Sequence, residues 1–201
     1  MKKILIALCA ALFLIPSCNK DQQDEKGQKK KYSIEDVQAV DLGLSVLWAD
    51  RNIGAESPED PGHFFSWGET TPRKYDTFAS PYIFGDTDAP VKLTGEYDTA
   101  TTLWGDGWRM PTMEELRDLS NLSHKETKDG DGNTTGTTIS GNGQSIYIPI
   151  AEPKNAYKSY GLWSSERSED PLWANYFDNY GNGISHSRRE YAHAIRPVKD
   201  K

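Results

Sequence analysis

Cysteine is nearly absent from this 201-residue sequence, which has only Cys9 and Cys18 and no cysteine between Val40 and Val198. The main part of the chain therefore has no disulfide, no thiolate nucleophile and no cysteine-based metal site. Its stability must come from a hydrophobic core, and about 160 residues are enough to build one.

Long hydrophobic runs are also missing. The apolar run from Ile4 to Ile15 is much shorter than the ~20 residues that a membrane-spanning helix needs. Two lysines precede the run and a small residue, Ser17, precedes Cys18, a pattern typical of a secretory signal. A thiol directly after the cleavage point predicts a lipoprotein signal over residues 1–17, with Cys18 as the lipidated N-terminus. The alternative is an ordinary cleaved signal followed by an incidental cysteine, and Pro16 is an uncommon residue at its position.

An excess of basic residues is missing too. The formal charge is −7, and it becomes −9 when the predicted signal leaves with its two lysines. An acidic protein without a basic stripe repels phosphate backbones, which excludes nucleic acid as the expected partner. We expect membrane contact through the lipid alone, at the cell envelope and specifically the outer membrane.

Residues 19–31 include no apolar side chain. They cannot bury surface to offset the entropy lost on ordering, so they should form a solvated tether. Their acidic residues resemble signals that send some lipoproteins to the cell surface, although any tether has a similar composition. The predicted organisation is a signal at 1–17, the lipidated cysteine with a flexible polar tether at 18–39, one domain at 40–198 and a tail at 199–201.

Short apolar and aromatic runs alternate with loops rich in Gly, Asn and Asp, which predicts short strands. In Ser145–Ala151, three isoleucines alternate with Tyr147 and Pro149, which is typical of a half-buried strand. Because Pro149 cannot donate a ladder hydrogen bond, we expect this strand at a sheet edge. The expected strands are Leu42–Trp48, Phe64–Trp67, Ser145–Ala151, Leu162–Ser165, Trp173–Phe177 and Ala192–Val198.

One segment has the pattern of a helix. Thr112 and Glu115 have the spacing of a capping box, in which the side chain of each residue accepts a hydrogen bond from the backbone N–H of the other. Met113, Leu116, Leu119 and Leu122 then follow at helical spacing. With mostly strands and at least one helix, the predicted fold class is α+β.

Several motifs occur together in an order typical of one family. They are Val40–Ala49, Asn52–Ala55, Phe65–Thr70, Gly107–Thr112 with Glu115 and Leu116, Gly161–Ser165, and Ile195–Val198. They span the domain and resemble the Fibrobacter succinogenes major paralogous domain family, whose members are typically secreted or surface lipoproteins without an established activity. The family is similar in fold to C-type-lectin-like and formylglycine-generating-enzyme domains, and to the variable proteins of diversity-generating retroelements. The resemblance implies a C-type-lectin-like domain of short, mostly antiparallel strands with one or two helices and long loops.

The large residues of these motifs are interpreted as scaffold. Arg109 could pack on an aromatic face or form a bidentate pair with Glu115 or Asp41, and either arrangement would be a structural clamp. We make the same interpretation for Arg196. The residues predicted to build the scaffold are Trp48, Trp67, Trp108, Arg109, Pro111, Trp163 and Arg196.

Signatures of catalysis and of metal binding are weak. Formylglycine-generating chemistry needs cysteine thiols, and the four histidines lie in no nucleophile signature. The loop from Asp129 to Asn133 resembles the start of a calcium-binding EF-hand, but its sixth and twelfth positions are Thr134 and Ser140. Residues 152–155 resemble a lectin calcium triplet that Lys154 interrupts. We therefore expect polar turns at both places, no metal, no cofactor and no catalytic residues.

The stretch from Glu166 to Tyr191 is dense in aromatic, amide and arginine side chains, which is typical of a recognition surface. The family resemblance places it between the last strands, where related proteins present their ligand-binding surface. The alternative is that about half of these residues face the core, for example Phe177, Ile184 and one of Trp173 or Tyr176. The candidate ligand-binding residues are Trp173, Asn175, Tyr176, Asp178, Asn179, Tyr180, Asn182, His186, Arg188, Arg189 and Tyr191.

The sequence leaves three functions open. The first is a non-catalytic binding or display module, held by its lipid, that recognises an extracellular glycan or protein. The second is a structural or assembly subunit of a surface complex, and the third is an enzyme of unrecognised chemistry.

Overall fold

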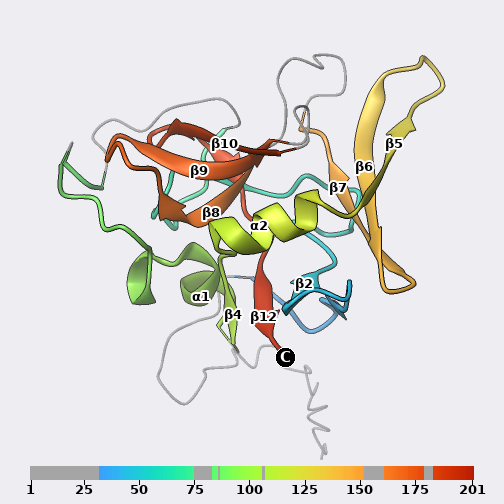
Figure 1. Ribbon diagram of the computed structural model, residues 1–201, viewed down its shortest axis with the longest axis horizontal. Helices are drawn as coiled ribbons and strands as arrows, with labels where there is room; N and C mark the ends of the chain where they lie inside the picture. The colour runs from blue at the N-terminus through green and yellow to red at the C-terminus, as the bar shows by residue number, and fades with distance from the viewer. Residues whose placement is uncertain (1–31, 75–82, 86, 106, 152–160, 179–182) are drawn as a thin grey trace, which may run out of the picture.

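The computed structural model describes residues 32–74, 83–85, 87–105, 107–151, 161–178 and 183–201 (Figure 1). Among these residues there are two α-helices, α1 at Thr99–Trp104 and α2 at Met113–Ser120, and a 3-10 helix at Gly95–Tyr97. The other elements are strands, nearly all paired antiparallel. The α+β class is therefore confirmed. No helix among the described residues has the length and apolar character needed to cross a membrane.

The strands in the described part of the chain form three sheets. The first has the order β1-β2-β12-β4, with bounds Ala39–Val40, Val46–Ala49, Val198–Asp200 and Trp108–Arg109. The second has the order β10-β9-β8-β11-β3, with bounds Gly183–Arg188, Trp173–Asp178, Gly161–Arg167, His193–Ala194 and Phe64–Phe65. The third has the order β5-β6-β7, with bounds Ser123–Lys128, Thr134–Gly141 and Gln144–Pro149. The expected edge position of the Pro149 strand is confirmed.

Helix α2 lies between the sheets, with β8–β10 above it, β2, β4 and β12 below it and the β5–β6 hairpin to one side (Figure 1). Its buried residues, Leu116 and Leu119, join Phe177 of β9 and Ile139 of β6 in one core cluster. A second cluster holds four tryptophans, Trp67, Trp104, Trp108 and Trp163. The domain is thus built on two adjoining cores, one aliphatic around α2 and one rich in indole rings.

The packed part of the chain extends beyond the predicted limits of 40 and 198. Tyr32, Ile34 and Val37, which we assigned to the tether, pack against the tryptophan-rich cluster. The Tyr32 hydroxyl lies 2.9 Å from His63 Nδ1. At the other end, residues 199 and 200 continue β12 instead of forming a tail, and Lys201 pairs with Asp41 at 2.9 Å. Residues 32–39 differ in composition from residues 19–31, because they include apolar side chains that the core can bury.

The capping box at the start of α2 is present as predicted. Thr112 Oγ1 accepts a hydrogen bond from the Glu115 N–H, and Glu115 Oε2 accepts one from the Thr112 N–H. Arg109 donates to both Glu115 oxygens at 2.9 and 2.7 Å and to Asp200 at 2.8 Å. The bidentate clamp is confirmed with Glu115 as the partner, not Asp41, and it ties α2 to β4 and β12.

This clamp predicts acid sensitivity. Burial opposes ionisation of Glu115, but the bonds from Arg109 and Thr112 outweigh it, so the pKa of Glu115 lies below its ordinary value of 4.5. A depressed carboxyl pKa contributes stability that is present above the unfolded-state value and is lost as pH falls through the folded-state value. Glu115→Gln should therefore reduce the loss of unfolding free energy below about pH 4.5. Urea unfolding from pH 7 down to pH ~2.5 measures it.

Glu114→Gln is the matched control, because Glu114 is exposed on the same first turn. It should keep the pH dependence of the parent. If Glu115→Gln lost as much unfolding free energy at acid pH as the parent and Glu114→Gln do, the clamp would not contribute to the acid sensitivity of the fold.

Candidate functional site

The predicted recognition stretch folds into the end of β8, the turn after it and the hairpin of β9 and β10. Antiparallel pairing sets Arg188 opposite Trp173 and His186 opposite Asn175. Side chains that face each other across a strand pair share one face of the sheet. These four residues therefore share the face on which Phe177 packs against α2.

A hollow of about 770 Å³ lies on this face, beside Met113 at the start of α2. Its volume is within the usual range of small-molecule sites. All of its lining residues except Met113 come from the stretch between Glu166 and Tyr191. The lining residues are Met113, Arg167, Ser168, Glu169, Asp170, Trp173, Asn175 and His186.

The wall of the hollow is held by backbone and side-chain hydrogen bonds. Arg167 donates through one terminal nitrogen to the carbonyls of Ser168 at 2.7 Å and Glu169 at 3.0 Å. The Asn175 amide donates to the Arg167 carbonyl at 2.9 Å. Glu166 Oε2 accepts the Met113 N–H at 3.0 Å, which fixes the start of α2 against β8. The turn is thus pre-formed.

Polar groups remain available for a ligand. The rings of Trp173 and His186 meet edge to face, with centroids 5.7 Å apart and planes at 87°. Within the described part of the chain, neither nitrogen of His186 and neither carboxylate oxygen of Glu169 has a hydrogen-bond partner. An indole beside an imidazole, an amide and a carboxylate can stack on a ring and bind its hydroxyls.

Other predicted site residues do not join this hollow. Tyr176 lies on the opposite face, stacked on His193 at 4.8 Å and edge to face with Trp163 at 6.1 Å. Asp178 alternates with Phe177 and shares the face of Tyr176. Period-two alternation thus splits the predicted surface between two faces of the sheet.

Arg189 was predicted at the surface, and this was wrong. Its side chain is fully buried, donates to the Gly85 carbonyl at 3.0 Å and lies 5.9 Å from the Phe84 ring centroid. Arg188 is exposed and pairs with Glu190, and Tyr191 is exposed outside the hollow. Asn179, Tyr180 and Asn182 lie outside the described residues.

The alternative of core-facing residues is confirmed in part. Phe177 is buried and Ile184 packs against the same cluster. Trp173 and Tyr176 lie on opposite faces of the sheet, and both side chains are half-buried, so neither is a fully buried core residue.

The motif tryptophans are interior residues that join β3 to β8. Trp67 Nε1 donates to the Ser164 carbonyl and Trp163 Nε1 donates to the Phe65 carbonyl, both at 2.8 Å. Each of the two motifs, Phe65–Thr70 and Gly161–Ser165, therefore donates an indole hydrogen bond to the backbone of the other. Trp48, Trp108 and Pro111 are buried as well.

Arg196 is fully buried and joins three segments. It donates to Asn52 Oδ1 at 2.7 Å, the Ala49 carbonyl at 3.1 Å and the Tyr147 carbonyl at 2.8 Å. Burial lowers the pKa of Arg196. These contacts support the interpretation of Arg196 as scaffold.

The calcium-like loop at Asp129 forms a turn in which the Asp129 carboxylate accepts the N–H groups of Asp131 and Asn133 and the Asn133 side-chain amide. Its oxygens thus hold the turn. Among the residues that the structure describes, no group of three or more His, Cys, Asp or Glu side chains is placed to hold a metal ion. Residues 152–155 lie outside the described ranges.

Sequence reasoning identified the stretch but not the four residues that form half of the lining. Arg167, Ser168, Glu169 and Asp170 resemble any polar loop, and only their position at the end of β8 and directly after it could have singled them out. Met113 was identified as a helix residue alone. Comparisons of the chain with models of known protein families, with curated proteins and with solved structures found no match.

Proposed function

We propose that this chain is a non-catalytic, lipid-anchored binding module of the cell envelope. In this proposal, Cys18 carries the lipid, the fold is C-type-lectin-like, and the chain is a member of the Fibrobacter succinogenes major paralogous domain family. The ligand is an extracellular glycan that sits in the hollow beside Trp173. The observation that carries the proposal is that one stretch of chain supplies nearly the whole lining of that hollow.

The chemistry of the lining favours a glycan. Trp173 offers a ring for stacking, while Asn175, His186 and Glu169 offer donors and acceptors for hydroxyl groups. Arg167 and His186 stand beside Glu169 and Asp170, so the hollow has no strong preference for one sign of charge. A pre-formed wall reduces the entropy lost on binding.

A protein partner is the second candidate, and one observation supports it. Among the described strands, β10 pairs only with β9 and ends the second sheet, so its outer backbone groups are placed to receive a strand from another chain. This contact would make the chain an assembly subunit.

The binding proposal predicts the behaviour of Trp173→Ala. On a glycan array, affinity for the best glycan should fall about tenfold or more, because aromatic anchors carry most of the energy of an interface. Tyr97→Ala, which removes a partly exposed tyrosine elsewhere, should bind as the parent does. Mass spectrometry of the bound glycan after long incubation should show it intact, as expected for a module without catalysis.

Two results would count against the proposal. One is an array on which no glycan is retained above background. The other is a glycan that Trp173→Ala retains as strongly as the parent. A glycan recovered in cleaved form would favour the third function, an enzyme.

A further inference from the structure

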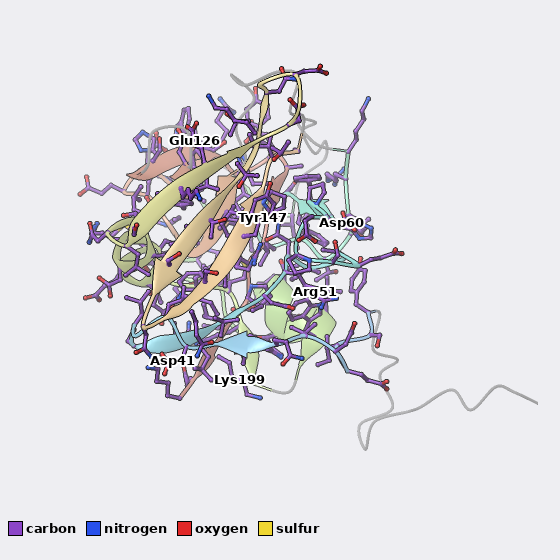
Figure 2. All side chains as sticks on the ribbon, turned by 90° about the vertical axis from the view of Figure 1, so that its right-hand side faces the viewer. Asp41, Arg51, Asp60, Glu126, Tyr147 and Lys199 are labelled. Carbon is purple, nitrogen blue, oxygen red and sulfur yellow. The ribbon has the colours of Figure 1, made fainter. Side chains whose placement is uncertain are left out.

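A second hollow, of about 760 Å³, lies on another side of the molecule. One wall is the outer face of the β5-β6-β7 sheet, and the facing wall is the loop that includes Pro58, Glu59 and Pro61. Figure 2 views this side, with Tyr147 on the sheet and Asp60 on the loop beside it. None of its lining residues is shared with the hollow beside Trp173.

Tyr147 is fixed against the sheet in a way that holds its ring flat. A Cβ atom added to Gly136 would lie only 2.3 Å from Tyr147 Cζ, so the ring rests directly on the glycine. The Tyr147 hydroxyl donates to Thr135 Oγ1 at 3.0 Å, and Thr135 donates to the Thr127 carbonyl at 3.2 Å. The buried Arg196 holds the Tyr147 carbonyl from behind. A ring oriented in advance, with a hollow beside it, can stack on a ligand without losing rotamer freedom.

Hydroxyl groups surround this ring. Thr138 is the cross-strand neighbour of Tyr147, and Ser145 lies two residues before it on β7, so both lie on the same face. Both line the hollow. Hydroxyl groups donate and accept, so they match the hydroxyl groups of a sugar.

The charge of the hollow is of one sign. Asp50 and Glu59 line it, and no Lys, Arg or His does so among the described residues. Both Asp50 oxygens accept bonds from Arg51, at 3.1 and 3.0 Å, whereas the Glu59 carboxylate has no partner within the described part of the chain. Such a site repels phosphates and acidic sugars and suits an uncharged hydroxylated ligand.

We propose that this hollow is a second binding site, specific for a short uncharged saccharide. One sugar ring stacks on Tyr147, and Thr138, Ser145 and Glu59 bind its hydroxyl groups. The site does not depend on the hollow beside Trp173. Two sites on one chain would let a long polysaccharide engage both, which strengthens retention without any new contact.

The test uses the full-length lipoprotein in detergent and isothermal titration calorimetry. The probes are neutral hexasaccharides prepared from cellulose, xylan, mannan and starch, and an acidic hexasaccharide of galacturonate. We expect at least one neutral hexasaccharide to bind and the acidic one not to bind at this site. Tyr147→Ala should weaken the neutral ligand about tenfold or more, as expected for an aromatic anchor. Tyr147→Phe, which keeps the ring on Gly136, should retain most of the affinity.

A second variant covers the case in which Tyr147→Ala does not fold. Ser145→Trp places a bulky residue in the hollow from an exposed strand position, so it should block binding while leaving the melting temperature unchanged. Tyr97→Ala is the matched loss of a tyrosine outside both hollows and should bind normally.

Three results would overturn this inference. They are the absence of binding by every neutral hexasaccharide, binding that survives both Tyr147→Ala and Ser145→Trp, and binding of the galacturonate probe that Tyr147→Ala abolishes. Binding lost in Trp173→Ala but kept in Tyr147→Ala would overturn this inference and support the proposed function. The reverse pattern would support the second site and count against the first.

Discussion

Replacement of Trp163 by alanine should lower the free energy of unfolding by about 3–5 kcal/mol, the usual cost of emptying a large buried aromatic site. Trp163 is fully buried on β8. Its ring meets His193 edge to face at 4.4 Å, and its indole N–H donates to the Phe65 carbonyl. Alanine would leave both a cavity and a buried carbonyl without its donor, and the two costs act together.

Urea unfolding followed by far-ultraviolet circular dichroism measures the change, with the denaturant slope checked for two-state behaviour. Trp163→Phe should lose less than Trp163→Ala, because it fills most of the space and lacks only the hydrogen bond. Trp173→Ala is the matched tryptophan loss at a half-buried position and should cost clearly less. If Trp163→Ala cost only about 1 kcal/mol, as an ordinary substitution does, the scaffold interpretation of this motif would be wrong.

Only the local part of the fold could be predicted from the sequence. A capping box and helical spacing are local patterns, so α2 could be predicted from a dozen residues. The edge position of β7 could likewise be predicted from Pro149, which cannot donate a ladder hydrogen bond. The bonds from Trp67 to Ser164 and from Trp163 to Phe65 join residues about a hundred positions apart. No local pattern encodes such contacts, so the arrangement of the sheets could not be derived from the sequence.

Strands β5 and β6 were missed because their composition resembles a loop. β5 reads Ser-His-Lys-Glu-Thr-Lys and is exposed except at His124. A strand without an apolar face gives no period-two signal, and backbone pairing with β6 decides its structure. The run Ala192–Val198 failed for another reason. It divides into β11 and β12, which lie in different sheets, and Arg196 lies between them.

The candidate site was predicted as a stretch and not as a surface. Composition indicated that residues 166–191 were suited to recognition, but composition does not say which residues share a face. That assignment depends on strand register, since a shift by one residue exchanges the faces. With the register known, Trp173, Asn175 and His186 lie together, and Tyr176 lies on the other face. Arg189 follows the end of β10, where alternation no longer applies, and it turns inward.

Cys18→Ala should remove the lipid and release the processed protein from the membrane fraction. The signal pattern ends at Ser17, and only a thiol at the next position can carry a thioether-linked diacylglycerol. The domain should remain folded, because Tyr32 is the first of the described residues that packs against the core and thirteen polar residues or glycine separate it from Cys18 in the sequence. Metabolic labelling with an alkyne fatty acid, membrane fractionation and the mass of the N-terminal peptide measure lipidation, location and processing separately.

Cys9→Ala is the matched control, because Cys9 lies inside the apolar run and leaves with the predicted signal. It should keep the label and the membrane location. In Cys18→Ala, the label should disappear, and every molecule whose signal has been cleaved should be found in the soluble fraction with an unchanged melting temperature. A cleaved Cys18→Ala chain that still sediments with membranes would mean that something other than a lipid on Cys18 holds the protein there. An unlabelled parent protein that is cleaved at another position would favour the ordinary signal with an incidental cysteine.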